Sequence, residues 1–438
     1  MMDPLLVGSL GLGLVFLLIA LHVPIGVAMG LAGFISIGIL LDFEKSISLF
    51  STEPTSIIAS ADFAVIPLFL LMGSFAAAAG LSADIYRFAY CFVGHYRGGL
   101  ALATIGGCAG FGAVCGSSIA TAATMTRIAL PEMLERRYQP ALATGCIAAG
   151  GTLGILIPPS VIMVLYGILT EQFVITLFVA AIVPGLLTVV FYFIATGIYT
   201  YVYPEAGPPG ERMSWPERVK VFRQTWGVIV LGIVVSGGIY GGIFTVAEAA
   251  AVGAGMALAF TVARGKLTRR VLWGILGETA ANTGMIYVLI IGASIFTYFV
   301  SLSQMPAELV ALIKGLGMPP LMVMVMITIM YLILGSVFDT VAAMVITLPF
   351  VFPLVVGLGY DPIWFGVYNV MVIEVGMITP PIGINVFVLH GMARDIPLAT
   401  VFRGILPYFG ADLARLGFLL LFPALATWLP SAVGMPMS

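Results

Sequence analysis

Long runs of apolar residues recur along the whole chain, and they limit its possible folds more than any other feature. Of the 438 residues, 61% are hydrophobic and 9% are charged, against about 25% charged residues in an average soluble domain. This composition excludes a soluble enzyme, a nucleic-acid-binding protein and a disordered chain. It predicts an all-α polytopic membrane protein that lies in a lipid bilayer, with helices crossing about 30 Å of hydrocarbon. The ten predicted spans are residues 5–22, 24–41, 63–80, 141–169, 173–203, 226–243, 247–263, 273–300, 363–390 and 404–428.

Two further apolar stretches, 98–126 and 319–357, are interrupted near their middles by Gly, Ser, Thr and Pro. Irregular backbone at membrane depth survives only where protein or a water-filled cavity covers it. We therefore predict that both stretches are re-entrant hairpins, which enter and leave the membrane on one face.

The basic residues predict the orientation of the spans. With the N-terminus outside the cell and ten alternating spans, 15 of the 18 Lys and Arg residues fall in cytoplasmic loops, as the positive-inside rule requires. The longest polar stretch, 204–225, is then a cytoplasmic linker, and its second part is predicted to form a short amphipathic surface helix. The cytoplasmic residues are Arg87, Arg97, Arg127, Arg136, Arg137, Arg212, Arg218, Lys220, Arg223, Arg264, Lys266, Arg269, Arg270, Arg394 and Arg403.

The two halves of the chain repeat each other. GSSIATAAT, which begins at residue 116, corresponds to GSVFDTVAA, which begins at residue 335, and GILIPPS at 154–160 corresponds to GMITPPI at 376–382. Each half, 1–203 and 226–438, holds five spans and one hairpin. Because five is odd, the second half starts on the opposite side of the membrane, so the repeats are inverted. Inverted repeats with interrupted helices are typical of secondary transporters, whose sites lie near the midplane at the repeat interface.

Each hairpin is followed by a span that a double proline interrupts, Pro158-Pro159 in the first half and Pro380-Pro381 in the second. Proline removes a backbone donor and leaves carbonyl groups free. Free carbonyls with Ser and Thr oxygens suit a hard monovalent cation, while helix N-termini favour an anion. We predict two Na⁺ sites around one carboxylate substrate. The alternative is that these small residues only allow close helix packing.

Charged residues inside membrane spans are candidates for function. Asp339 lies at the predicted tip of the second hairpin and is the best charged candidate for a cation ligand. Asp412 and Arg415 are spaced to pair on one helix face. Glu248 is either a helix N-terminal carboxylate near the membrane interface or forms a structural hydrogen bond to a neighbouring helix, and Glu374 either braces the break at Gly376 or carries a proton. No Gly-x₄-Gly-Lys-Ser/Thr loop occurs, so a nucleotide site of that type is excluded and uphill transport would use an ion gradient.

At these residues the sequence resembles the large membrane subunit of tripartite ATP-independent periplasmic (TRAP) transporters, over essentially its whole length. The motifs that carry the resemblance are CGSSIATAA (115–123), LPEMLERRYQPALATG (130–145), GILIPPSVIMVLYG (154–167), IVPG (182–185), GIFTVAEAAAV (242–252), FDTVAA (338–343), DPIWFGV (361–367) and EVGMITPPIGINVFVLHG (374–391).

The resemblance implies an elevator-type transporter in the bacterial inner membrane, with scaffold and transport regions and Na⁺ as the coupling ion. It implies two partners, a small four-helix membrane subunit, here expected as a separate chain, and a periplasmic substrate-binding protein. It also implies Na⁺ ligands in two sets, the first made of Ser117, Ser118, Gly154 and Pro158, and the second of Asp339, Thr340, Gly376 and Thr379. For the substrate, an organic acid or acidic sugar, we predict contacts from Thr121, Pro159, Pro381 and Asn385. A self-sufficient Na⁺/dicarboxylate symporter of the related divalent-anion class is the alternative, and a passive channel is a further one.

Overall fold

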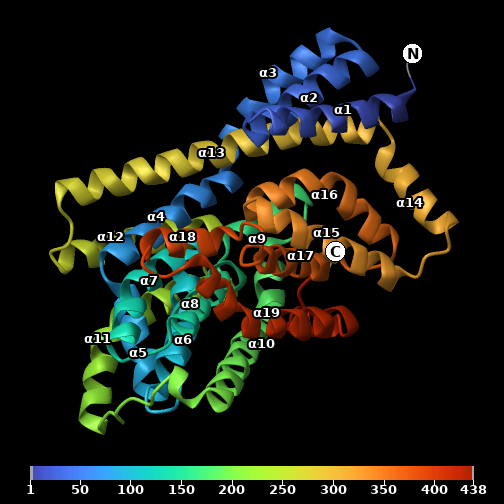
Figure 1. Cartoon of the computed structure of the whole chain (residues 1–438). Helices are drawn as coiled ribbons and strands as arrows, with labels where there is room; N and C mark the ends of the chain where they lie inside the picture. The colour runs from blue at the N-terminus through green and yellow to red at the C-terminus, as the bar shows by residue number, and fades with distance from the viewer. Residues whose placement is uncertain (1–2, 437–438) are drawn as a thin grey trace.

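The structure is a computed structural model that describes residues 3–436, and every regular element in that range is helical (Figure 1). Most helices are built from apolar residues. Because an α-helix pairs its backbone N–H and C=O groups internally, such helices suit a lipid environment. The first ten are α1 (Pro4–Ala20), α2 (Ile25–Leu40), α3 (Phe43–Ala59), α4 (Val65–Ala78), α5 (Leu81–Val93), α6 (Gly99–Cys115), α7 (Ser118–Glu135), α8 (Pro140–Leu156), α9 (Val161–Leu169) and α10 (Val174–Val202). The others are α11 (Trp215–Tyr240), α12 (Val246–Ala263), α13 (Arg269–Leu302), α14 (Met305–Gly315), α15 (Pro320–Val337), α16 (Thr340–Gly357), α17 (Pro362–Gly376), α18 (Ile384–Met392), α19 (Leu398–Leu421) and α20 (Ala424–Ala432).

The described residues contain eight helices that are long and apolar enough to cross a membrane, or nine if α8 and α9 count as one span. The chain is therefore an all-helical membrane protein, but length and composition give fewer spans than the ten predicted. The difference arises because α1, α2 and α17 are shorter apolar helices. Conversely, α15 and α16, predicted to form one hairpin, are each long enough to span.

The chain reverses at each stretch that interrupts its apolar pattern. Between α6 and α7 it turns at Gly116, which takes the left-handed backbone conformation, and Ser117 caps α7. Between α15 and α16 it turns at Phe338, and Asp339 caps α16. The return helix α7 continues to Glu135, beyond the predicted end at 126. The double prolines separate α8 from α9, which are bent by 44°, and α17 from α18.

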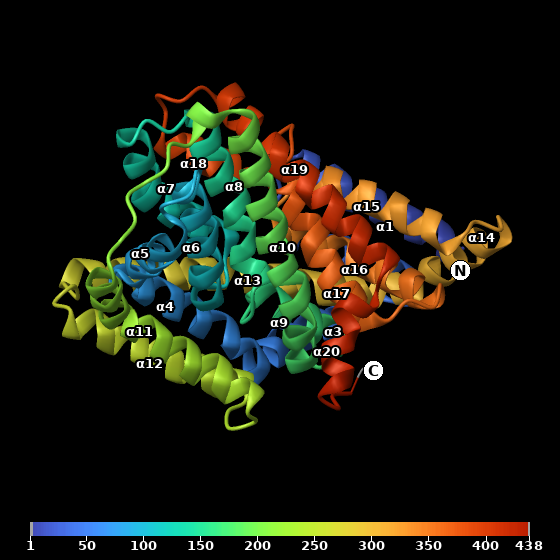
Figure 2. The same ribbon diagram turned by 90° about the horizontal axis from the view of Figure 1, so that it is seen from below.

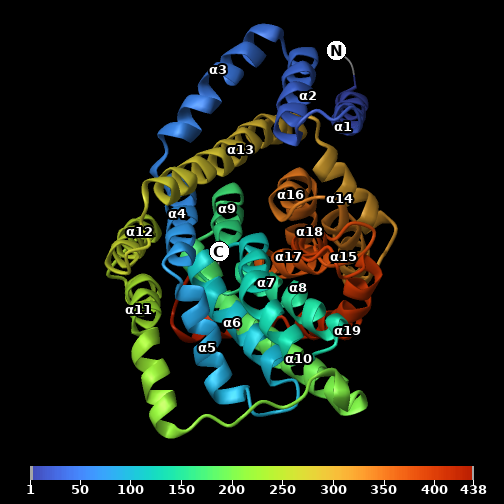
Figure 3. The ribbon, with the colours of Figure 1, turned by 60° about the vertical axis from the view of Figure 1, so that its left-hand side comes forward.

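Peripheral helices surround a buried interior (Figure 3). The long helix α13 lies between the α1–α3 group and the rest of the molecule (Figure 1), and α11 and α12 lie along one edge (Figure 2). Helix α2 packs against α13, and α12 packs against α4. Contact between α2 and α13 depends on small residues, since a Cβ at Gly26 would lie 2.6 Å from the Cα of Leu289. Inside this frame, nearly every residue of α8 and α17 is buried.

Two elements differ from the predictions. Residues 43–59 form the helix α3, which was not predicted because Glu44, Lys45, Glu53 and Pro54 interrupt its apolar residues. The predicted short surface helix at the end of 204–225 is not separate. Instead, α11 begins at Trp215 and continues without a break to Tyr240, because Ser214 and Glu217 form a capping box at its start and no later residue breaks it.

Candidate functional site

The first hairpin tip lies directly against the first broken span. An ideal Cβ at Gly154 would lie 2.6 Å from the carbonyl oxygen of Ser117, so only glycine allows this approach. A Cβ at Gly116 would likewise lie 3.3 Å from the carbonyl oxygen of Pro159. The side chain of Ser117 accepts a hydrogen bond from the Ala120 amide (3.3 Å), which starts α7. The backbone oxygens at the tip and at the break therefore lie close together.

The turn between α15 and α16, the predicted tip of the second hairpin, contacts the end of α17 and the start of α18 in a corresponding way. A Cβ at Gly376 would lie 2.6 Å from the Cα of Gly335, and the Gly383 amide donates to the carbonyl of Ser336 at 3.0 Å. One carboxylate oxygen of Asp339 accepts from the Ala342 amide at 3.0 Å, so Asp339 caps α16 as Ser117 caps α7. The hydroxyl of Thr379 donates to the carbonyl of Val375 at 2.7 Å.

A buried carboxylate connects the second hairpin to α17. The Thr340 hydroxyl donates a 2.6 Å hydrogen bond to Oε1 of Glu374, and both side chains are buried. The side chain of Ser118, at the start of α7, also lies beside Glu374. Ser118 and Thr340 were predicted in separate ion sites, whereas the structure brings both next to one carboxylate.

The predicted substrate contacts divide into two kinds. Thr121 and Asn385 are buried, and among residues 3–436 the Thr121 hydroxyl and both polar atoms of the Asn385 amide have no hydrogen-bond partner. They lie on α7 and α18, which pack against each other although they come from opposite halves of the chain. Pro159 is buried but Pro381 is exposed, so the two double prolines are not in equivalent surroundings.

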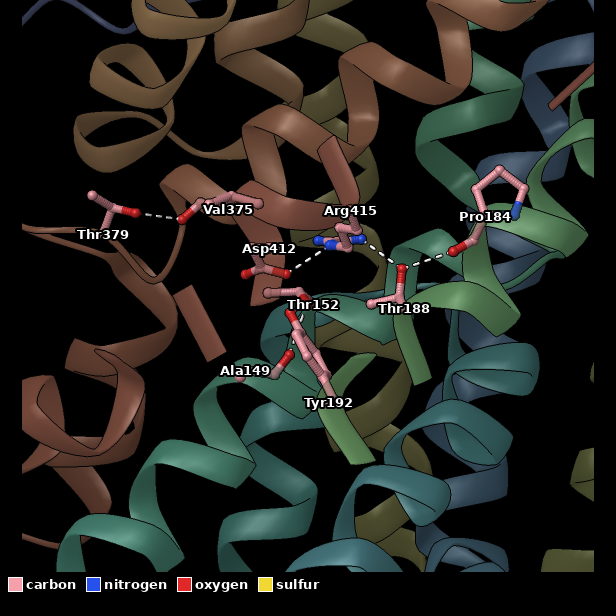
Figure 4. A network of polar contacts seen from close by, with 9 residues as sticks. All are labelled: Ala149, Thr152, Pro184, Thr188, Tyr192, Val375, Thr379, Asp412 and Arg415. Atoms are coloured by element: carbon pink, nitrogen blue, oxygen red, sulfur yellow. Dashed lines mark hydrogen bonds and ion pairs between the residues drawn. The ribbon is translucent and has the colours of Figure 1, made fainter. Parts of the chain in front are cut away.

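A polar network holds α19 against α10 and α8 (Figure 4). The predicted pairing of Asp412 and Arg415 is confirmed, since Nε of Arg415 lies 2.6 Å from Oδ1 of Asp412 and both side chains are fully buried. Arg415 also donates to the Thr188 hydroxyl at 2.6 Å and lies over the Tyr192 ring, 5.8 Å from its centre. Tyr192 and Thr152 share a 3.1 Å hydrogen bond that reaches α8.

Sequence reasoning identified the Asp412–Arg415 pair but not its partners on α10. Thr188 and Tyr192 lie more than 200 residues from Arg415 in the chain, and no pattern in a single sequence links them. The contact of Ser336 with Gly383 was also missed because it uses backbone atoms. Glu248 forms a capping box with Thr245 at the start of α12. Of its two predicted roles, the structure therefore shows that of a carboxylate at a helix N-terminus.

The chain matches the family described as "Tripartite ATP-independent periplasmic transporter, DctM component" over residues 12–425. It is 36% identical over 374 residues to the C4-dicarboxylate TRAP transporter large permease protein DctM of Pseudomonas aeruginosa, covering 84% of this chain and 86% of the relative. It is 33% identical over 425 residues to the isethionate TRAP transporter permease protein DctMQ of Oleidesulfovibrio alaskensis, covering 93% of this chain and 64% of that protein. The structure resembles the crystal structure of the Alcanivorax borkumensis YdaH transporter, with a TM-score of 0.62, 18% identity and 91% of each chain covered.

These similarities extend over the hairpins, the broken spans and the peripheral helices alike. The identity with the solved structure is low, so that likeness concerns the fold alone. The family match extends over residues 12–425, and the Pseudomonas aeruginosa large permease aligns with 84% of this chain. The chain therefore belongs to the DctM family of TRAP transporter large permeases, and it is a transporter subunit and not an enzyme.

Proposed function

We propose that this chain is the large membrane subunit of a Na⁺-coupled, binding-protein-dependent transporter that imports a small carboxylate by an elevator mechanism. The observation that carries the proposal is that each hairpin tip lies against the broken span of its own half. A Cβ at Gly154 or at Gly376 would collide with the neighbouring tip. Backbone and hydroxyl oxygens gathered at membrane depth suit a hard monovalent cation.

Two inverted repeats account for the way the halves pack. In the repeat, α2 corresponds to α12 and α4 corresponds to α13. The two contacts are therefore equivalent under the repeat: α2 of the first half packs against α13 of the second, and α12 of the second half packs against α4 of the first. The second part of each broken span also reaches the other half, with α18 against α7 and α9 against α16. We assign residues 1–203 and 226–438 to the repeats, with 204–225 as the cytoplasmic linker and the N-terminus in the periplasm.

For the coupling ions we keep the two predicted regions. The first comprises Ser117, Ser118, Gly154 and Pro158, and the second comprises Asp339, Thr340, Gly376 and Thr379. Two Na⁺ ions carried with a monoanion would move one net positive charge inward, which gains about 2.3 kcal/mol per 100 mV of membrane potential. The buried and unpartnered groups of Thr121 and Asn385 are the best placed to contact the substrate.

An elevator mechanism requires one group of helices to move against another. We assign the peripheral helices α1–α3 and α11–α13 to the scaffold and the hairpins with their broken spans to the transport region (Figure 3). The partners proposed are a small four-helix membrane subunit and a periplasmic binding protein, in the inner membrane of a bacterium. The relative named DctMQ is longer than this chain, which covers 64% of it, as expected if a second subunit is fused to the permease.

Uptake into proteoliposomes tests the dependence on partners. We expect a carboxylate retained by the cognate binding protein to accumulate only when that protein, the small subunit and this chain are all present. Omitting either partner should lower uptake to the level of empty vesicles, because the permease then receives no substrate or lacks the small subunit with which its own scaffold helices are expected to assemble. Full uptake by this chain alone would contradict the proposal and favour the self-sufficient symporter.

A further inference from the structure

Residues 206–210 of the linker, here called the strap, lie tightly against the first half of the chain (Figure 3). Ala206 and Gly207 are buried, although a connecting loop usually runs over the protein surface. The Gln139 amide donates to the carbonyl of Ala206 at 2.9 Å, and the Gly98 amide donates to the carbonyl of Gly207 at 2.8 Å. Buried backbone groups need partners of this kind, so the strap is a fixed part of the structure.

Close backbone contacts extend this attachment to Gly210. Its amide donates to the carbonyl of Gly94 at 3.0 Å, and an ideal Cβ at Gly210 would lie 2.6 Å from the hydroxyl oxygen of Tyr90. An ideal Cβ at Gly207 would lie 2.9 Å from the Cα of Gly98. Glycine at these two positions therefore lets the strap lie directly on the chain beneath it.

The strap joins the two ends of the first hairpin that lie away from its tip. Helix α6 begins at Gly99, and α7 ends at Glu135. Gly94 and Gly98 belong to the segment before α6, whereas Gln139 belongs to the turn after α7. Because the strap is hydrogen-bonded to both segments, the two helices cannot separate at this end without breaking some of these bonds.

The hydroxyl of Tyr138 connects the strap to both helices at once. The Tyr138 side chain is buried, and its hydroxyl accepts from the Leu100 amide at 3.1 Å and donates to the carbonyl of Pro208 at 3.0 Å. Leu100 lies in the first turn of α6, where backbone amides have no partner within the helix. A single hydroxyl group therefore links the turn after α7, the start of α6 and the strap.

The second hairpin has only local bonds at its corresponding ends. These ends are residues 316–319, before α15, and residues 358–361, after α16. Within the described part of the chain, every backbone–backbone hydrogen bond of these two segments joins residues at most five positions apart. Gly317 and Gly359 are exposed, in contrast to the buried Gly98. The two hairpins are thus held differently, although the halves repeat each other in sequence.

Two cavities border the second hairpin. The larger, of about 430 Å³, lies between α16 and the helices α13 and α14, with Pro349 and Thr297 in its lining. The other, of about 230 Å³, lies between α1 and the pair α15 and α16, with Leu12 and Phe350 in its lining. Close-packed interiors leave few spaces larger than a water molecule. The second hairpin therefore has free space on the side of the helices assigned to the scaffold.

We propose that the strap, fixed by Tyr138, holds the first hairpin closed against its broken span throughout transport, so that the second hairpin is the one that moves to admit the substrate. Tyr138 is then a positioning residue, because it lies at the end of the hairpin away from the tip and acts through the start of α6. The restraint on the first hairpin follows from the contacts alone, whereas its role in transport rests on the proposed function.

Hydrogen–deuterium exchange of the purified full-length chain, read by mass spectrometry, tests the restraint. In the wild type, the amides of the α6–α7 turn should exchange more slowly than those of the α15–α16 turn. Tyr138→Phe removes the hydroxyl, and the amides at the start of α6 and in the α6–α7 turn should then exchange about tenfold faster, because local opening no longer breaks its hydrogen bonds. Exchange in the α15–α16 turn should not change, as it would after a general loss of stability.

Two further variants complete the experiment. Tyr201→Phe is the matched control, since the Tyr201 side chain lies near the end of α10 and is 84% exposed, and it should exchange like the wild type at both hairpins. Gly207→Ala displaces the strap without changing Tyr138, because the new Cβ meets the Cα of Gly98, and it should act like Tyr138→Phe. Should Tyr138→Phe not fold, as judged by gel filtration, Gly207→Ala decides the matter.

The outcomes separate this inference from the proposed function. Wild-type exchange of the first hairpin in Tyr138→Phe and Gly207→Ala would overturn the strap, whether or not the chain carries a carboxylate. A wild-type α6–α7 turn that exchanges as fast as the α15–α16 turn would overturn the choice of the second hairpin as the moving one. Failure of the proposed function would show instead as absent uptake with both partners present, and the exchange results would still hold.

Discussion

Replacing Arg415 with Met should destabilise the protein by about 3–5 kcal/mol, because the change leaves the buried carboxylate of Asp412 without its partner. The guanidinium also donates to Thr188 and lies over the Tyr192 ring, so contacts between α19 and α10 are lost as well. The measurement is thermal unfolding of the detergent-solubilised protein, in which Arg415→Met should lower the midpoint strongly.

Two further variants show whether the lower unfolding midpoint comes from the lost ion pair or from the loss of any arginine. Arg403→Met changes an exposed arginine on the same helix and should leave the midpoint nearly unchanged. The double variant Arg415→Met with Asp412→Leu removes both charges, and it should recover much of the lost stability because no isolated buried charge remains. An Arg415→Met protein as stable as Arg403→Met would show that the buried pair does not hold these helices together.

Adding one methyl group at Gly376 should separate the second hairpin from its broken span. An ideal Cβ there would lie 2.6 Å from the Cα of Gly335 and 3.0 Å from the amide nitrogen of Ser336. Backbone atoms cannot move aside as a flexible side chain would. Gly376→Ala should therefore destabilise the protein by about 1–3 kcal/mol through overpacking, and it should weaken Na⁺ binding at the second tip.

Gly391→Ala is the matched control, since no atom of the described residues outside its own helical turn lies within 4 Å of a Cβ at that position in α18. Alanine is favoured over glycine in a helix by up to about 1 kcal/mol, so this variant should be at least as stable as the wild type. Thermal unfolding with and without Na⁺ measures both effects. Wild-type stability and Na⁺ response in Gly376→Ala would mean that the tip does not need this close contact.

The sequence predicts those parts of the fold whose signals are local. Gly116 in a small-residue stretch marks the first chain reversal, and the double prolines mark the breaks after α8 and α17. Both signals are local, because glycine permits a left-handed backbone at its own position and proline removes its own backbone N–H. The spacing of Asp412 and Arg415 predicts their pairing for the same reason. The amphipathic helix α3 has no such signal, since Glu53 and Pro54 lower its apolar content and interrupt its pattern.

Contacts between distant segments could not be predicted from one sequence. Thr340 and Glu374 come from different helices, and only the packing of α16 on α17 brings the hydroxyl to the carboxylate. The capping roles of Ser117 and Asp339 are local and could have been expected, because Ser and Asp are preferred at helix N-termini. Their use as caps occupies one side-chain oxygen each, so the proposed ion sites would depend more on carbonyl groups than the residue types suggest.

Substrate uptake as a function of Na⁺ concentration tests the central claim most directly. Proteoliposomes would contain this chain and the small subunit, with the binding protein and its carboxylate added outside. Because each hairpin tip lies against its own broken span, we predict that uptake requires an inward Na⁺ gradient and rises with a Hill coefficient above one. Full uptake driven by a proton gradient in Na⁺-free buffer would contradict Na⁺ coupling at the two hairpin tips.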